Sequence, residues 1–212
     1  MTHDAPMVHL VDDDDSFRVA MARILQLAGY VVREYPSAGE FLLAGTERRG
    51  PGCILLDLRL PGPSGLMLHE ALAKTEDALP VVFVSGHGDL QSGVRAMKAG
   101  AVDFLTKPVN REALLSAVGE AITRDARHRT HRDRRKDLDA RYATLLPRER
   151  EIFDFVVAGK LNKQIALALG IAERTVKVHR AQMMIKMRAA SMAELVFIAA
   201  QLRSDGDTPA DR

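Results

Sequence analysis

The stretch Cys53-Ile54-Leu55-Leu56-Asp57 decides the fold, because it is a short apolar run that ends in a single acid. A run of this length is typical of a buried strand. Four further apolar runs occur within the first 122 residues, and amphipathic stretches separate them. Five strand–helix units in series predict an α/β fold, with a parallel sheet that carries helices on both faces.

The bounds of these elements follow from where each apolar run and each amphipathic stretch begins and ends. The expected strands are Met7–Val11, Val31–Tyr35, Cys53–Leu56, Val81–Ser85 and Val102–Leu105. The expected helices are Ser16–Leu27, Ala38–Leu43, Gly65–Ala73, Leu90–Ala99 and Arg111–Ala121. The pairs Ala28-Gly29 and Ala99-Gly100 favour helix C-termini, because glycine adopts the left-handed conformation that is common there.

Composition restricts the class of protein. With 47% hydrophobic residues, the chain has enough apolar surface for a packed core. Its apolar runs are too short to span a bilayer, and the N-terminus has acids where a signal peptide would carry basic residues. The single cysteine, Cys53, cannot form an internal disulfide and is expected in the core. We therefore expect a soluble, cytoplasmic protein with no membrane partner.

Charge is divided unevenly along the chain. Residues 1–122 carry 11 basic and 16 acidic side chains, whereas residues 123–212 carry 19 basic and 12 acidic ones. The overall net charge of +2 therefore combines −5 in the first part with +7 in the second. This asymmetry indicates a C-terminal part that contacts nucleic acid, with a solvated basic face as the alternative.

The C-terminal part also has a different pattern of elements. Residues Arg124–Ala140 are rich in Arg and lack Gly and Pro, which favours a helical linker. After Leu145 only helical patterns follow, with Pro147 in the first turn of one helix and Asn162 as the N-cap of the next. We expect an α/β domain at 1–122, a basic helical linker at 123–143, an all-α domain of four helices at 144–204 and a disordered tail at 205–212.

Several polar residues lie at the expected carboxyl ends of strands, where parallel α/β sheets bind ligands. Asp12 and Asp13 follow the first strand, Asp57 ends the third, Ser85 ends the fourth, and Lys107 follows the fifth. In a sheet ordered 2-1-3-4-5 the first and third strands are neighbours, so the three acids converge. Adjacent negative charges are costly without a cation among them, and an all-oxygen cluster suits Mg²⁺.

This combination predicts phosphoryl transfer. Asp57 is the expected nucleophile, the metal offsets charge in the transition state, and Lys107 and Ser85 hold the oxygens of the transferred group. The alternative for Asp12–Asp15 is a surface run of acids or a cluster of acids at the N-cap of a helix. For Asp14 and Asp15 we expect this alternative, because acids are favourable at the start of a helix.

Four motifs across residues 7–122 resemble those of a CheY-like receiver domain. They are Val11-Asp12-Asp13-Asp14, Leu56-Asp57-Leu58-Arg59-Leu60-Pro61-Gly62, Ser85-Gly86-His87-Gly88-Asp89 and Thr106-Lys107-Pro108. The resemblance implies a doubly wound sheet of order 2-1-3-4-5, with Asp57 as the phosphoacceptor. It also implies Mg²⁺ bound by Asp13, Asp57 and the backbone carbonyl of Arg59, with Asp12 acting mainly through water.

The same resemblance implies a cis bond between Lys107 and Pro108. It further implies two switch residues, Ser85 and Phe104. Phe104 replaces the commoner Tyr and has no hydroxyl to bond, so an ordinary core aromatic is the alternative.

Residues 161–180 have the form of a helix-turn-helix. The expected core positions are Ile165, Ala166, Leu169 and Val176. On the second helix Lys177, Val178 and Arg180 then point away from the core. A helix of this kind fits the major groove of DNA, with cationic side chains on phosphates and others at base edges.

Residues 145–203 resemble the LuxR-type helix-turn-helix of the NarL/FixJ response regulators, beginning with Leu145-Leu146-Pro147-Arg148-Glu149-Arg150-Glu151. Leu146 and Ala172 stand where Thr or Ser is usual, and each change removes a helix cap worth ~1 kcal/mol. By position, the resemblance implies base-edge contacts from Lys177 and Val178. It implies phosphate contacts from Lys163 and His179, and Arg180 belongs to the same expected surface.

The fourth helix of this part carries an apolar stripe. Leu195, Ile198, Ala199 and Leu202 follow the i, i+3, i+4, i+7 spacing of one helix face. Core packing explains such a stripe. The resemblance implies that this helix also dimerises, in which case part of the stripe is an interface.

We therefore expect a DNA-binding transcription regulator, not an enzyme, that a sensor histidine kinase controls by phosphorylating Asp57. Its expected partners are promoter DNA, that kinase, a second copy of the chain after phosphorylation, and RNA polymerase. One alternative is an aspartate-nucleophile phosphatase of the haloacid-dehalogenase kind. Those enzymes carry an acidic pair two residues apart, whereas Leu58 and Arg59 follow Asp57. The other is a phosphorelay, protein-binding or RNA-binding module.

Overall fold

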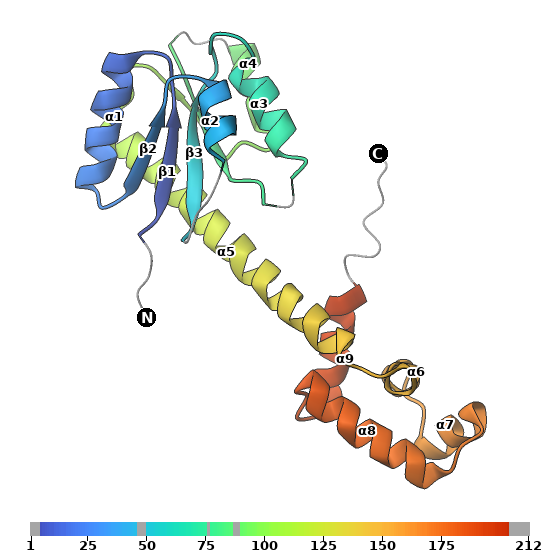
Figure 1. Ribbon diagram of the computed structural model, residues 1–212. Coiled ribbons are helices and arrows are strands. Elements are labelled where there is room, and N and C mark those ends of the chain that lie inside the picture. The colour runs from blue at the N-terminus through green and yellow to red at the C-terminus, as the bar shows by residue number, and fades with distance from the viewer. Residues whose placement is uncertain (1–4, 46–49, 76, 87–89, 204–212) are drawn as a thin grey trace. The chain divides into compact units, whose positions relative to one another are not determined.

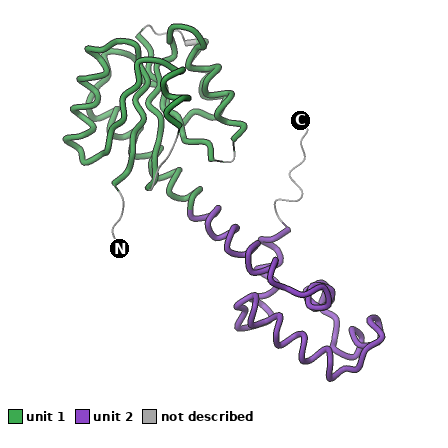
Figure 2. The backbone as a smooth tube through the Cα atoms, in the orientation of Figure 1, with its two compact units in different colours: residues 1–129 green, residues 130–212 purple. Residues whose placement is uncertain are grey.

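The computed structural model describes residues 5–45, 50–75, 77–86 and 90–203 (Figure 1). The chain divides into two compact units, residues 1–129 and residues 130–212 (Figure 2). Helix α5, Arg111–Ala143, contributes its first part to unit 1 and the remainder to unit 2. The expected helical linker is thus a direct continuation of this helix.

Unit 1 contains a five-stranded parallel sheet in the order β2-β1-β3-β4-β5, as the sequence predicts. Its strands are β1 Met7–Val11, β2 Val31–Tyr35, β3 Gly52–Asp57, β4 Val81–Ser85 and β5 Asp103–Thr106. Its helices, besides the first part of α5, are α1 Asp15–Leu27, α2 Ala38–Ala44, α3 Gly65–Leu72 and α4 Leu90–Lys98. This strand order places the carboxyl ends of β1 and β3 side by side.

Two apolar cores lie on opposite faces of this sheet, because successive strand residues point to opposite sides. One core joins Val8, Leu10, Cys53 and Leu55 to α1 and α5. The other joins Val11, Ile54, Leu56 and Phe83 to α2, α3 and α4. Cys53 is fully buried and burial raises the pKa of its thiol, which confirms the prediction of a core residue.

Strand β5 begins one residue later than predicted. The ladder pairs Val82 with Asp103 and Ser85 with Thr106, so two polar residues belong to the strand. The apolar pattern alone favoured Val102 as the first residue. Val102 instead donates its N–H to the carbonyl of Val81 at 2.8 Å, just before the strand begins.

Unit 2 consists of the end of α5 and four further helices within the described residues, as predicted. These are α6 Pro147–Val157, α7 Asn162–Leu169, α8 Glu173–Met187 and α9 Met192–Arg203. They share one core, which includes Leu138, Ile152, Phe153, Val176 and Met183. The end of α5 is therefore part of this unit's core.

The prediction of Asn162 as an N-cap is wrong. Leu161 is the N-cap of α7, and the side chain of Gln164 accepts a hydrogen bond from the Leu161 N–H at 2.9 Å. At α6 and α8, Leu146 and Ala172 make no side-chain cap bond, as expected. The Gln164 side chain thus supplies one half of a capping box, and the apolar Leu161 side chain cannot supply the other half.

Two expectations fall outside the described residues: the tail at 205–212 and the motif residues His87, Gly88 and Asp89. Within the described ranges, no helix is both long enough and apolar enough to cross a bilayer.

Gly65 allows α3 to begin against the end of β3. A Cβ at this position would lie 2.2 Å from the carbonyl oxygen of Asp57 and 3.2 Å from Leu56 Cγ. The Gly65 N–H donates to the carbonyl of Leu58 at 3.1 Å. Because only glycine fits this approach, Gly65 helps to fix the backbone of Asp57.

We expect Gly65→Ala to lower the free energy of unfolding of unit 1 by about 1–3 kcal/mol, because the methyl group must displace backbone. Urea denaturation measures the loss. Gly39→Ala in α2 is the matched control, since its Cβ would meet nothing nearer than Ser37 Oγ at 3.8 Å. Equal stabilities of the two variants would contradict the account of Gly65.

Candidate functional site

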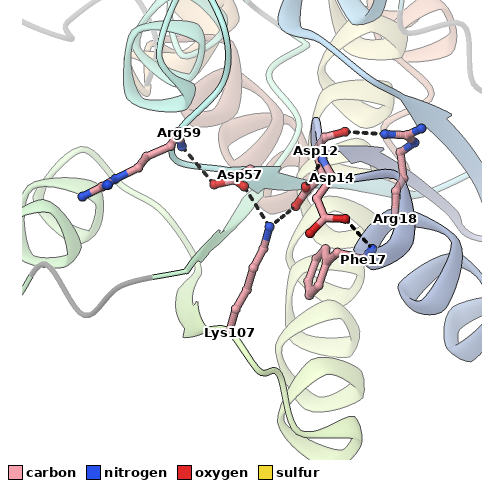
Figure 3. Close-up of polar contacts among 7 residues, drawn as sticks. All are labelled: Asp12, Asp14, Phe17, Arg18, Asp57, Arg59 and Lys107. Atoms are coloured by element: carbon pink, nitrogen blue, oxygen red, sulfur yellow. Dashed lines mark hydrogen bonds and ion pairs between the residues drawn. The ribbon is translucent and has the colours of Figure 1, made fainter.

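Two carboxylates and one ammonium meet at the carboxyl ends of the strands in unit 1 (Figure 3). Lys107 Nζ lies 2.7 Å from Asp12 Oδ2 and 2.9 Å from Asp57 Oδ2. Asp12 follows β1, Asp57 is the last residue of β3, and Lys107 follows β5. The ammonium therefore bridges two carboxylates from neighbouring strands.

Asp13 adds a third carboxylate to this group. The ligand oxygens of Asp12, Asp13 and Asp57 all lie within 4.8 Å of one another. Asp12 and Asp57 are buried, whereas Asp13 is exposed, so solvent reaches the group from the side of Asp13. A cluster of carboxylate oxygens of this kind has the donor chemistry that a hard divalent cation requires.

Backbone groups hold the two buried carboxylates in place. Asp57 Oδ1 accepts a hydrogen bond from the Arg59 N–H at 2.9 Å, and Asp12 Oδ1 accepts one from the Asp14 N–H at 2.9 Å. The second oxygen of each carboxylate binds Lys107. Both side chains are thus fixed before any ligand arrives.

Burial and pairing act in opposite directions on these groups. Burial raises the pKa of Asp12, and this effect outweighs the hydrogen bonds from Lys107 and Asp14, which lower it. Burial lowers the pKa of Lys107, but its hydrogen bonds to Asp12 and Asp57 outweigh burial and leave that pKa raised. Lys107 therefore keeps its charge at neutral pH, which the role predicted for it at phosphoryl oxygens requires.

The other residues that the receiver resemblance singled out are on β4 and β5 and in the segment that follows β5. Ser85 is buried at the end of β4, and its carbonyl accepts from the Lys107 N–H at 2.8 Å. Phe104 is half-buried on β5, and a Cβ at Gly93 of α4 would meet its ring at 3.4 Å. The bond between Lys107 and Pro108 is cis, as expected.

The first turn of α1 holds two acids in the positions that the sequence predicts, and two further residues beside the site, Phe17 and Arg18, that it does not predict. Asp14 is the N-cap and accepts from the Phe17 N–H at 3.1 Å, and Asp15 lies in the first turn, as expected. Arg18 Nη1 donates to the carbonyl of Asp12 at 2.7 Å, and the Phe17 ring lies beside Lys107. The sequence feature that could have indicated Arg18 is a basic residue about one helical turn after the acids Asp14 and Asp15.

The helix-turn-helix of unit 2 is formed by α7 and α8. Val176 is fully buried, whereas the Lys177 side chain is 63% exposed and Val178 is 56% exposed. Lys163 on α7 is also exposed, and His179 is half-buried. The face that was expected to meet DNA is thus open at the two positions that were predicted to contact bases.

Arg180 makes a contact within unit 2 that the sequence did not predict. Its Nη1 donates to Asn162 Oδ1 at 2.9 Å, in a partly buried bond between α8 and the start of α7. This bond ties the two helices of the motif together. The guanidinium of Arg180 thus helps to align the two helices, and its place on the DNA-contacting surface stays a prediction.

A buried ion pair fixes α8 against α6. Glu149 Oε2 accepts from Lys186 Nζ at 2.6 Å and from the Leu146 N–H at 2.8 Å. Burial raises the pKa of Glu149, but the bonds from Lys186 and Leu146 outweigh it and leave that pKa lowered. By accepting from the Leu146 N–H, Glu149 also supplies one half of a capping box at the start of α6, although Leu146 has no polar side chain to supply the other half.

The apolar stripe of α9 belongs to the core of unit 2. Leu195, Ile198 and Ala199 are buried, and Leu202 is half-buried against the same cluster. Core packing therefore accounts for the stripe, and these side chains are turned away from solvent. The exposed large apolar residues of this helix are Val196 and Phe197, at 44% and 54% exposure.

Comparison with known proteins matches both parts of the chain. Residues 8–119 match the response regulator receiver domain, and residues 143–199 match the bacterial regulatory proteins of the luxR family. This chain belongs to the NarL/FixJ family of response regulators. The family is one of transcription regulators.

Relatives and a solved structure agree over nearly the whole chain. The response regulator protein TodT of Pseudomonas putida is 39% identical over 96% of this chain and 89% of its own length. The transcriptional regulatory protein FixJ of Azorhizobium caulinodans is 43% identical over 91% of this chain and 90% of its own. The solved structure of the response regulator StyR, 41% identical, superposes with a TM-score of 0.84 over 93% of this chain and all of its own.

Proposed function

We propose that this response regulator accepts a phosphoryl group on Asp57 and then binds promoter DNA through α8. The pairing of a receiver with a luxR-type domain implies DNA and a sensor histidine kinase as its partners. The observation that carries the proposal is the bridge from Lys107 to Asp12 and Asp57 beside the exposed carboxylate of Asp13. It supplies a nucleophile, a cation and an opening to solvent in one place.

The proposed reaction is a transfer between nitrogen and oxygen. A carboxylate oxygen of Asp57 attacks the phosphorus of the kinase phosphohistidine, the P–N bond breaks, and its electron pair returns to the imidazole nitrogen. Lys107 and the hydroxyl of Ser85 hold the transferred oxygens. The carboxylate group fits Mg²⁺, for which Asp13, Asp57 and the Arg59 carbonyl are the proposed ligands, with Asp12 acting through water. When bound, the ion offsets negative charge at the phosphoryl group.

For unit 2 we propose DNA as the ligand of the open face of the helix-turn-helix. Lys177 and Val178 are the proposed base contacts, because their side chains are exposed where Val176 is buried. Lys163 and His179 are the proposed phosphate contacts. The proposed domain bounds are 1–122 for the receiver, 123–143 for the linker and 144–204 for the DNA-binding domain.

We further propose that phosphorylation dimerises the receiver. Movement of Ser85 and Phe104 would change the surface of α4, where Val94 and Met97 are already 47% and 46% exposed. In the DNA-binding part, Val196 and Phe197 are the proposed contact, in place of the buried stripe on α9. RNA polymerase is a further proposed partner of the regulator on DNA.

Asp57→Asn should abolish labelling by a phosphodonor, because an amide is a poor nucleophile and carries no charge for the metal. Asp13→Ala should weaken Mg²⁺ binding and slow labelling. Asp14→Asn is the control, since Asn caps a helix as well as Asp does, and it should label normally. The measurement is the rate at which a base-labile phosphate appears on the protein.

A normal labelling rate in Asp57→Asn would refute the site. Sustained hydrolysis of small phosphomonoesters by the unaltered protein would favour an aspartate-nucleophile phosphatase instead.

Lys177→Ala should reduce specific DNA binding by about 1–3 kcal/mol if its ammonium reaches a base edge. Lys163→Ala should weaken binding to all sequences alike and reduce the salt dependence of the affinity, because it removes a phosphate contact. Titrations of specific and scrambled duplexes at several salt concentrations separate the two effects. Unchanged affinity and sequence preference in Lys177→Ala would show that α8 is not the recognition helix.

A further inference from the structure

We propose that Phe17 is a positioning residue of the phosphoryl-transfer site, which holds the ammonium of Lys107 through the face of its ring. This inference rests on the proposed function of Asp57 and Lys107. Lys107 Nζ lies 4.0 Å from the centroid of the Phe17 ring (Figure 3). A cation at this distance from the face of an aromatic ring is attracted by the negative electrostatic potential of that face.

The contacts around Phe17 form a closed circuit. Asp12 Oδ1 accepts from the Asp14 N–H, and Asp14 Oδ1 accepts from the Phe17 N–H, at 2.9 and 3.1 Å. The Phe17 ring contacts Lys107, and Lys107 returns to Asp12 Oδ2 at 2.7 Å. The backbone of Phe17 and its ring are thus both tied to the same carboxylate.

Arg18 holds this turn of α1 against the sheet. Its Nη1 donates to the carbonyl of Asp12 at 2.7 Å, its Nε lies 3.8 Å from Glu34 Oε2 on β2, and it pairs with Asp15. The Arg18 side chain is only 12% exposed. Because the turn is fixed to both β1 and β2, Phe17 cannot shift without disturbing Asp12.

The ring completes the surroundings of the ammonium. Lys107 has three N–H donors, and the carboxylates of Asp12 and Asp57 accept from it on one side. With Phe17 beside it, the Lys107 side chain is 17% exposed. Phe17 itself is half-buried and packs against the core shared by α1 and α5. The ring thus takes up space beside the ammonium that water would otherwise fill.

Phe17 therefore bears on the rate of phosphoryl transfer through Lys107. Without the ring, a flexible and hydrated ammonium spends less time at the position from which it can stabilise charge on the transferred group. Positioned charge is worth more than mobile charge, because it needs no reorganisation during the reaction.

The test compares labelling rates of the full chain with a small phosphodonor and Mg²⁺. Phe17→Leu keeps an apolar side chain but loses the ring, and we expect labelling to slow roughly 3- to 30-fold, the range of a cation–π contact from exposed to desolvated sites. Phe17→Tyr keeps the ring and should restore most of the rate. Val19→Leu on the same helix, where Val19 is 62% exposed, is the control and should label normally.

A second series separates the charge of the ring from its packing. Mono-, di- and trifluorophenylalanine at position 17 keep the shape of the ring but reduce the negative electrostatic potential of its face. We expect the labelling rate to fall with each added fluorine. This series also tests the inference if Phe17→Leu fails to fold, because a fluorinated ring fills the same space.

Labelling that is independent of fluorination, or a folded Phe17→Leu protein that labels at the normal rate, would overturn the role of Phe17. Either result would leave the proposed function intact as long as Asp57→Asn abolishes labelling. Normal labelling of Asp57→Asn would instead refute the proposed function itself.

Discussion

The ion pairs from Lys107 to Asp12 and Asp57 are the interaction on which the rest of unit 1 depends. Two buried carboxylates repel each other, and an ammonium between them offsets that repulsion. Three features bring the groups together: the strand order, which makes β1 and β3 neighbours; Gly65, which lets α3 begin against Asp57; and the first turn of α1, which Arg18 fixes to Asp12. Their common result is a preformed, charged site that opens to solvent.

The sequence could predict the sheet and the acids, because both follow from local pattern. Apolar runs predict the strands. A polar residue directly after a buried strand must then lie at the carboxyl end of that strand. Contacts between side chains that are distant in the sequence produce no local sequence pattern, so they could not be predicted. The ring of Phe17 beside Lys107 joins residues 90 positions apart, and the bond from Arg180 to Asn162 crosses from one helix to another. For α9 the spacing of Leu195 and Ile198 correctly indicated one face, but spacing alone does not say whether a face meets its own core or a partner.

Charge limits the ways in which the two parts can communicate. Residues 1–122 carry a net charge of −5 and residues 123–212 carry +7. Phosphorylation makes the first part more negative, so electrostatic attraction between the parts grows slightly. Release of a masked DNA-binding domain is therefore hard to obtain from charge alone.

Self-association of the receiver avoids this difficulty. In the proposed dimer, two linked helix-turn-helix domains would bind half-sites about one helical turn apart, and their effective concentration would raise the affinity by a factor of order 10²–10⁴.

The central claim is that phosphorylation acts by joining two DNA-binding domains. The most direct test measures binding to one duplex with two half-sites, by the full chain with and without phosphate on Asp57 and by residues 130–212 alone, which retain Leu138 in their core. We predict that the fragment binds no better than the unphosphorylated chain. The phosphorylated chain should bind far more tightly and sediment as a dimer. If the fragment instead matches the phosphorylated chain, and that chain stays monomeric in the absence of DNA, the receiver acts by masking and the account is contradicted.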